Sequence, residues 1–218
     1  PGFIGNFDEG YLAACRVLPV RTDPDARGVN LDGIQLLDPF GQGNAQESQR
    51  ILAAAGVGVA ARFCDATLDD ITHASDFCVQ TDPDLPSGHG EVLGTFLGLD
   101  ETAHTLVCLE KRYDGVNVAA FEQERDAAEH AIEASCEKYL LRHDPPVAAL
   151  FSGFAYGDFA ARMLKKYLDA SITVIGCRNT AGYSSFRTAG ACSLSAVQDL
   201  IGGDAPDLIL GSSVERLA

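Results

Sequence analysis

The chain has 218 residues, of which 46% are hydrophobic and 22% charged, and its formal net charge is −15 at pH 7. This composition is typical of a folded globular protein, and no apolar run reaches the roughly 18 residues that span a bilayer. The negative charge argues against nucleic acid as a partner, because binding to phosphates requires clustered lysine and arginine. We therefore expect a cytoplasmic protein that binds neither membranes nor nucleic acid.

Residues 34–63 are predicted to form a strand, a glycine-bearing loop, a helix and a second strand. The apolar run at residues 34–37 ends before a proline, which cannot donate a ladder hydrogen bond. Gly41 favours a tight turn, and Asn44 is expected to cap a helix with apolar residues at helical spacing. Gly56 is the expected C-terminal stop of that helix.

The same order returns in the second half of the chain. A strand at residues 147–151 precedes the glycine-bearing segment 152–157, a helix and a strand at residues 171–176. Parallel strands need such helical crossovers, so we predict an α/β fold of parallel, Rossmann-like sheets flanked by helices, arranged as two consecutive lobes. Ligands of such sheets gather beyond the carboxyl ends of the strands.

A long polar surface helix at residues 119–143, closed by two prolines, is the expected domain boundary. We predict a first Rossmann-like domain at residues 1–115. The connecting helix and a second such domain are predicted at residues 116–218. A strand and the first turn of a helix at residues 207–218 suggest an unfinished α/β unit, so we expect the chain to be a fragment of a longer subunit.

The remaining segments give weaker patterns. Residues 91–113 are predicted to hold a helix followed by a strand at residues 104–113. Shorter elements are predicted elsewhere: helices at residues 9–18 and 68–73, and a strand at residues 76–81.

Seven cysteines occur without a CxxC pair, which favours a reducing compartment. Cys78 lies inside a predicted strand and Cys177 ends another, so each is either a buried thiol or a group that faces a ligand. The other five are interpreted as structural. The histidines show neither HxxxH nor HxH spacing, so no self-contained zinc centre is predicted from them, and His104 is interpreted as a surface residue.

The glycine-bearing segments DPFGQGN and FSGFAYGD have two interpretations. They cradle an anion on a helix N-terminus, or they are turns with no ligand. Neither completes GxGxxG or contains the lysine of a phosphate loop, so nucleotide binding is the less favoured interpretation. The chain also lacks a GxSxG elbow, so hydrolase chemistry has little support.

Four segments together resemble a known family. They are PGFIGNFDEGY, IQLLDPFGQGNAQESQRILAAAGVGVAARFCDATLDDI, ALFSGFAYGDFAARMLKKYLDASITVIGCRNT and PDLILGSS. In this order they resemble the component 1 proteins of nitrogenase and nitrogenase-like oxidoreductases, and the opening is most similar to the cofactor-scaffold branch. The resemblance covers nearly the whole chain.

This resemblance implies a redox subunit. The full-length protein would pair with a homologous component 1 subunit and accept electrons from an ATP-dependent iron–sulfur reductase. It would house an iron–sulfur cluster, another metallocofactor or a tetrapyrrole, whose chemistry the protein tunes through burial and hydrogen bonds. The isolated fragment is expected to carry no cofactor and to be inactive.

Position by position, the resemblance implies residues that line the cofactor cavity. They are Gly5, Asn6, Phe7, Phe40, Gly41, Ser152, Gly153, Phe154, Cys177 and Arg178. Cys78 is the candidate metal ligand, and no residue is assigned a catalytic role. The cofactor-holding cysteine of the family aligns with Thr81, and the cysteines of its bridging cluster would precede Pro1. Reduction of dinitrogen is therefore disfavoured.

Three alternatives to a reductase stay open. One is a small-molecule or metal-chelate binding module with a two-lobed cleft. Another is a cofactor-maturation scaffold without turnover. The third is a structural subunit half that contacts a partner.

Overall fold

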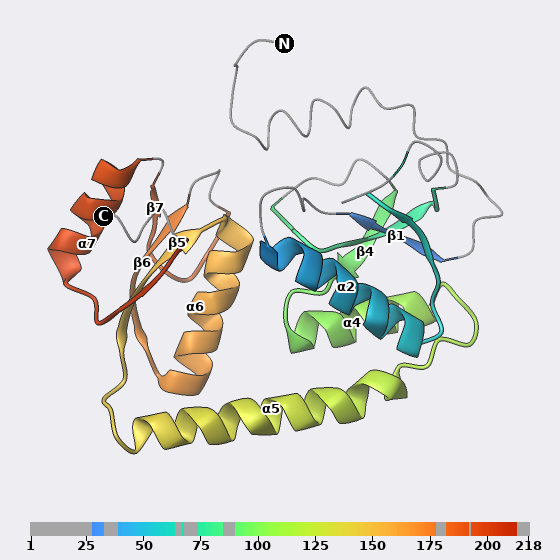
Figure 1. Ribbon diagram of the computed structural model, residues 1–218, viewed down its shortest axis with the longest axis horizontal. Helices are drawn as coiled ribbons and strands as arrows, with labels where there is room; N and C mark the ends of the chain where they lie inside the picture. Colours follow the sequence, from blue (N-terminus) through green and yellow to red (C-terminus); the bar gives the residue numbers. More distant parts are fainter. Residues whose placement is uncertain are drawn as a thin grey trace, which may run out of the picture. The chain divides into compact units, whose positions relative to one another are not determined.

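A computed structural model describes residues 28–32, 39–63, 67, 74–84, 90–177, 182–191 and 193–212. Its contacts divide the chain into two compact units, Pro1–Asp126 and Ala127–Ala218, and Figure 1 labels the elements of both. The described part has the predicted class, since two parallel four-stranded sheets are flanked by helices. None of the helices in this part combines the length and apolarity needed to cross a bilayer.

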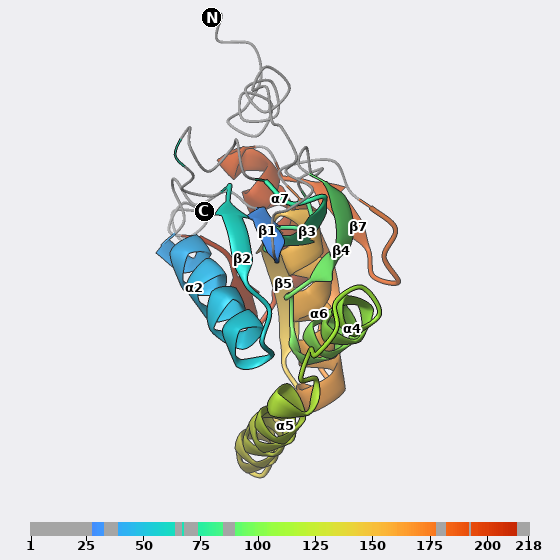
Figure 2. The same cartoon turned by 90° about the vertical axis from the view of Figure 1, so that its right-hand side faces the viewer.

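The first unit holds a sheet of strand order β2-β1-β3-β4, in which all pairs are parallel. Figure 2 shows these strands side by side in that order. Its elements are β1 (Val29–Asp32), α2 (Pro39–Ala54), β2 (Val59–Arg62), β3 (Phe77–Gln80), β4 (Glu91–Thr95), α4 (Leu99–Glu110) and the start of α5 (Ala119–Leu140). The core of the unit is an apolar cluster that includes Leu31, Leu52, Val79, Leu106 and Phe121.

Helix α2 begins earlier than the sequence predicted. Pro39 is its first residue, where the fixed φ of proline suits a helix and its missing N–H costs nothing. The loop assigned to Phe40 and Gly41 and the cap assigned to Asn44 are therefore wrong, because all three residues lie within α2. The predicted stop is confirmed, since Gly56 follows the helix with a φ of 80°.

The strand predicted at residues 104–113 is also wrong. Residues 104–110 belong to α4, residues 111–113 follow it, and a strand, β4, precedes that helix rather than following it. Thr102, Thr105, Leu106 and Leu109 are buried at the spacing of one helical face. The alternation expected of a strand is absent because the buried positions recur every three to four residues.

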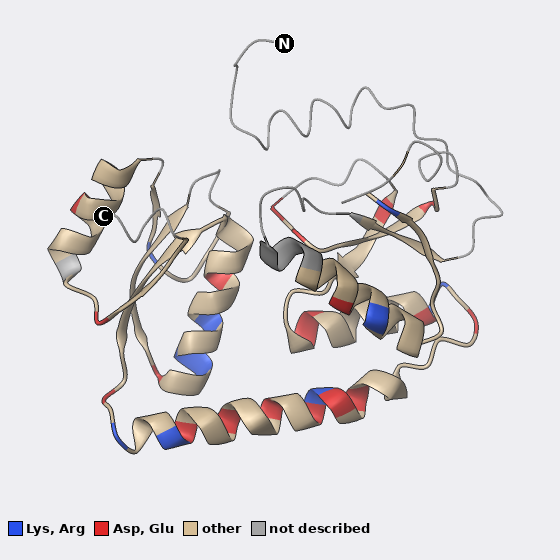
Figure 3. Cartoon of the chain, in the orientation of Figure 1, with Lys and Arg blue, Asp and Glu red and all other residues tan. Residues whose placement is uncertain are grey.

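Helix α5 confirms the long polar helix, although it ends three residues before the predicted His143. Acidic side chains recur along it (Figure 3), and Phe121 is its buried residue. Glu122 in the first turn suits the positive end of the helix dipole. The two prolines that follow, Pro145 and Pro146, prevent its continuation.

The second unit holds a parallel sheet of order β7-β6-β5-β8. Its elements after α5 are β5 (Val147–Ser152), α6 (Phe154–Leu168), β6 (Ser171–Cys177), β7 (Thr188–Gly190), α7 (Leu194–Asp204) and β8 (Leu208–Leu210). The strands predicted in this half are confirmed. Two apolar clusters pack on the sheet, one around Phe151 and Val174 and the other around Leu150 and Ile175.

Three of the predicted elements, at residues 9–18, 34–37 and 68–73, lie outside the described residues. The strand predicted at residues 76–81 is confirmed as β3.

Candidate functional site

The strand orders identify one position in each sheet where a ligand is expected. In a parallel sheet, ligands bind at the carboxyl edge where the chain reverses its direction of winding. That reversal falls between β1 and β3 in the first sheet and between β5 and β8 in the second. The carboxyl end of β5 is Ser152, one of the residues predicted to line a cavity.

Ser152 and Cys177 are brought together at this edge of the second sheet. They are register partners at the last positions of the parallel strands β5 and β6. Cys177 is also paired with Gly190 of β7. The sequence predicted Cys177 as the end of a strand and Ser152 as the first residue of the following loop, whereas the structure includes Ser152 in β5. The register places the two residues on neighbouring strands.

Helix α6 starts directly after this edge. Gly153 is its N-cap residue in an extended conformation, with φ −60° and ψ 155°, and makes no side-chain capping bond. The Ser152 Oγ donates to the Gly153 carbonyl oxygen at 2.7 Å, and the Gly157 N–H donates to the same oxygen at 3.0 Å. The segment predicted as a glycine-bearing loop is therefore mostly the first turn of a helix.

Gly157 has a packing role in this turn. A Cβ at this position would lie 2.6 Å from Ile175 Cγ2 and 2.9 Å from Ser152 Oγ. Glycine therefore allows α6 to approach the sheet closely, which is the role of one glycine in dinucleotide-binding turns. Contact with an anion is not needed to explain this glycine.

Phe154 and Cys177 take part in the apolar packing of the second unit. Cys177 is 1% exposed within the cluster around Leu150 and Ile175, and Phe154 packs against that cluster while partly buried. The Cys177 Sγ lies 3.7 Å from the Ile175 carbonyl oxygen, a weak hydrogen bond. The Phe154 ring also lies against the backbone of Gly182. Both side chains thus face the unit's own core.

A polar cluster near the start of α6 was not predicted. The Asp158 carboxylate accepts from Ser184 Oγ at 2.5 Å and from Arg162 Nε at 2.9 Å. The spacing of Asp158 and Arg162, four residues apart, was visible in the sequence as a helical ion pair. The bond from Ser184 joins positions 26 residues apart, so no local pattern indicates it.

Three of the other predicted site residues, Phe40, Gly41 and Cys78, belong to the first unit. Gly5, Asn6, Phe7 and Arg178 lie outside the described residues. Phe40 and Gly41 lie in the first turn of α2.

Cys78, the candidate metal ligand, is fully buried as the second residue of β3. It is paired with Asn30 and Val92 of the neighbouring strands. Thr81, which follows β3, is also buried. Across the described ranges, no group of three or more histidine, cysteine, aspartate or glutamate side chains is arranged to hold a metal ion.

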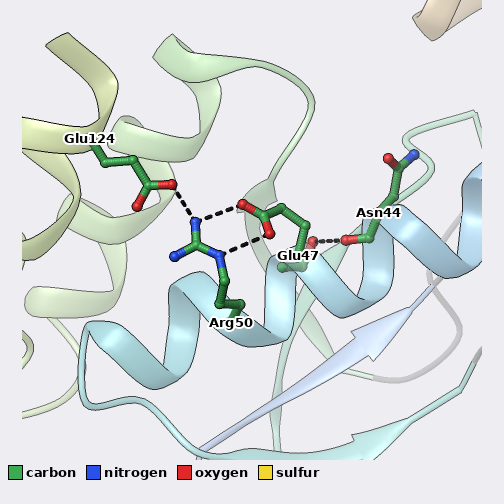
Figure 4. A network of polar contacts seen from close by, with 5 residues as sticks. Asn44, Glu47, Arg50 and Glu124 are labelled. Atoms are coloured by element: carbon green, nitrogen blue, oxygen red, sulfur yellow. Dashed lines mark hydrogen bonds and ion pairs between the residues drawn. The ribbon is translucent and has the colours of Figure 1, made fainter. Parts of the chain in front are cut away.

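A charged network in the first unit joins α2 to the first turns of α5 (Figure 4). Arg50 Nε donates to Glu47 Oε2 at 2.9 Å, and Arg50 Nη2 donates to Glu47 Oε1 and to Glu124. The bond from Arg50 lowers the pKa of Glu47, and the two carboxylates raise the pKa of Arg50. The partners are about half exposed, so this network is structural and worth little free energy.

No family model and no curated protein matches the chain. A solved structure of nitrogenase Cp1 at pH 5 matches with a TM-score of 0.56 and 18% identity, over 98% of this chain and 48% of that one. A structure of nitrogenase Cp1 at pH 6.5 matches with a TM-score of 0.54 and 16% identity, over 89% and 46%. The fold is nitrogenase-like. The chain spans about half the length of these structures.

Proposed function

We propose that this chain is part of a nitrogenase-like component 1 oxidoreductase subunit. In the full-length protein, the subunit would house an iron–sulfur cluster, another metallocofactor or a tetrapyrrole. Its partners would be a homologous subunit and an ATP-dependent iron–sulfur reductase. The observation that carries the proposal is the position of Ser152 and Cys177 at the carboxyl edge of a parallel sheet, within a nitrogenase-like fold.

The described residues do not supply a ligand set for such a cofactor. Cys78 lies inside its sheet and Cys177 inside an apolar cluster, and no metal-binding group of three donors is found among the described side chains. We therefore assign no cluster ligand and no reaction step to these residues. We propose instead that Phe154 and Cys177 exclude water from this edge of the sheet, and that Gly153 lets α6 begin directly after β5.

The test is anaerobic purification of the full-length protein that contains this chain, together with its neighbouring subunit. Iron and acid-labile sulfide would be measured, and electron paramagnetic resonance spectra recorded before and after reduction with dithionite. Stoichiometric iron with a cluster signal supports the proposal. A folded, metal-free complex that also lacks a tetrapyrrole absorption band overturns it.

A second candidate function is the binding of a small molecule without a cluster. The edge at Ser152 favours it, because a polar residue there borders the apolar side chains of Phe154 and Cys177, and a binding module needs a shaped edge and no thiolates. A metal-free complex that retains a small molecule, detected by mass spectrometry after denaturation, would support this candidate over the reductase.

A further inference from the structure

A histidine and a cysteine, two residue types that often bind metals, lie close together on one face of α4 in the first unit. His104 and Cys108 are four residues apart in this helix, so they lie one turn apart on the same face. The His104 Nε2 and the Cys108 Sγ are 3.9 Å apart. An extended strand, which the sequence predicted here, would separate the same residues by about 13 Å at 3.3 Å per residue.

This distance suits joint coordination of one cation. Zinc binds imidazole nitrogen at about 2.0–2.1 Å and thiolate sulfur at about 2.3 Å, so a tetrahedral angle separates the two atoms by about 3.5 Å. The observed separation exceeds this value by a few tenths of an ångström, which a small side-chain rotation removes. Imidazole and thiolate are also the ligand types that zinc and similar borderline-soft cations prefer.

Helix α4 holds the pair in place and leaves it accessible. The opposite face is fixed by the buried residues Thr105, Leu106 and Leu109, and Thr105 Oγ1 donates to the Thr95 carbonyl oxygen at 2.9 Å. His104 is exposed and Cys108 is half-buried. The chain's net charge of −15 attracts cations to such a surface.

We propose that His104 and Cys108 form a bidentate surface site for a divalent cation of the zinc class. Nε2 of the neutral imidazole donates its lone pair while the ring proton stays on Nδ1. The thiol releases its proton to water as the sulfur–metal bond forms. Water fills the remaining coordination positions. The site lies in the first unit and does not depend on the proposed redox function.

The test uses Co²⁺ as a spectroscopic probe of the 218-residue chain, kept reduced, with Zn²⁺ as competitor. We expect a near-ultraviolet thiolate-to-cobalt charge-transfer band that Zn²⁺ abolishes. Loss of one ligand removes the chelate effect, so His104→Ala and Cys108→Ser should each weaken binding at least about tenfold. Cys136→Ser removes another half-buried thiol and should leave the band unchanged.

A double variant, Cys108→Ser with Glu110→Cys, keeps the thiol count and His104 but moves the thiol off the shared face. It should bind as weakly as Cys108→Ser. Far-ultraviolet circular dichroism checks that each variant keeps the helix content of the parent chain. If His104→Ala does not, His104→Gln is the second test of the histidine. The absence of a cobalt–thiolate band, or a band unaffected by the His104 variants, would overturn the proposal.

Discussion

Ser152 and Cys177 end neighbouring parallel strands as register partners. One is the last polar residue before α6, and the other is a thiol buried in the apolar cluster beneath that helix. The same edge therefore combines a polar rim with an apolar floor. Such a combination suits a site that positions a ligand by a few hydrogen bonds while excluding water.

Gly157→Ala is expected to destabilise the second unit by about 1–3 kcal/mol. The added Cβ would meet Ile175 Cγ2 and Ser152 Oγ at under 3 Å, so α6 must move away from the sheet. Urea denaturation measures the change. Gly202→Ala is the matched control, because that position in α7 has open space around a Cβ and should gain up to about 1 kcal/mol. Equal effects of the two substitutions would contradict the close approach.

Asn30→Ala is expected to cost about 2–4 kcal/mol in the first unit. The fully buried Asn30 donates from Nδ2 to the Ser75 carbonyl oxygen and accepts from the Ser75 N–H, both at 2.8 Å. The substitution leaves these two backbone groups without their partner. Gln46→Ala, at an exposed position of α2, removes an amide of similar chemistry and should change the unfolding free energy little. A small effect at Asn30 would show that water replaces its side chain.

The ion pair of Glu47 with Arg50 should lower the pKa of the Glu47 carboxyl group. The hydrogen bond from Arg50 is the main cause of the shift. Because the pKa of Glu47 is lower in the folded chain, the ion pair stabilises the fold fully at pH values above the ordinary pKa of glutamate. This stabilisation is lost as the pH falls through the pKa of the folded state. Carboxyl-detected NMR titration measures the pKa. In Arg50→Gln it should rise towards the ordinary value, with a stability loss below about 1 kcal/mol that high salt reduces.

Alkylation of the native chain should separate its described cysteines into two classes. Cys108 and Cys136 are half-buried and should react, whereas the buried Cys78 and Cys177 should be protected until unfolding. Peptide mapping by mass spectrometry after timed labelling with iodoacetamide gives the rates. Labelling of Cys177 as fast as Cys136 would show that the carboxyl edge of the second sheet opens in solution.

Much of the fold could be predicted from local patterns. In the second unit, short apolar strands around a helical pattern predicted β5, α6 and β6, and in the first unit the helical spacing predicted α2, which Gly56 correctly ended. Strand β1 was not predicted. The strand predicted at residues 104–113 was wrong because two buried positions of α4, Thr102 and Thr105, are polar and hide the helical face from a hydrophobic pattern. Their hydroxyls donate to the backbone carbonyl oxygens of Gly98, which precedes α4, and of Thr95, which ends β4, so these bonds depend on the folded contact between β4 and α4.

The candidate site was less predictable. Strand ends placed Ser152 and Cys177 at an edge, but the sequence does not contain the register that makes them neighbours. The hydrogen bond from Ser184 to Asp158 joins positions that are distant in the sequence. Gly157 was predicted only as part of a glycine-bearing loop, whereas its role depends on the side chain of Ile175 in another element. Each of these features arises from tertiary packing.

Among the described strands, β8 lies at one edge of the second sheet, and its Ile209 and Leu210 are 43% and 38% exposed. An outer strand with apolar side chains offers its backbone to any other chain, so it is a template for intermolecular β-pairing. The net charge of −15 opposes this encounter through mutual repulsion between chains. Colloidal behaviour should therefore depend on ionic strength, with the isolated chain remaining dispersed at low salt and self-associating as counterions screen the repulsion.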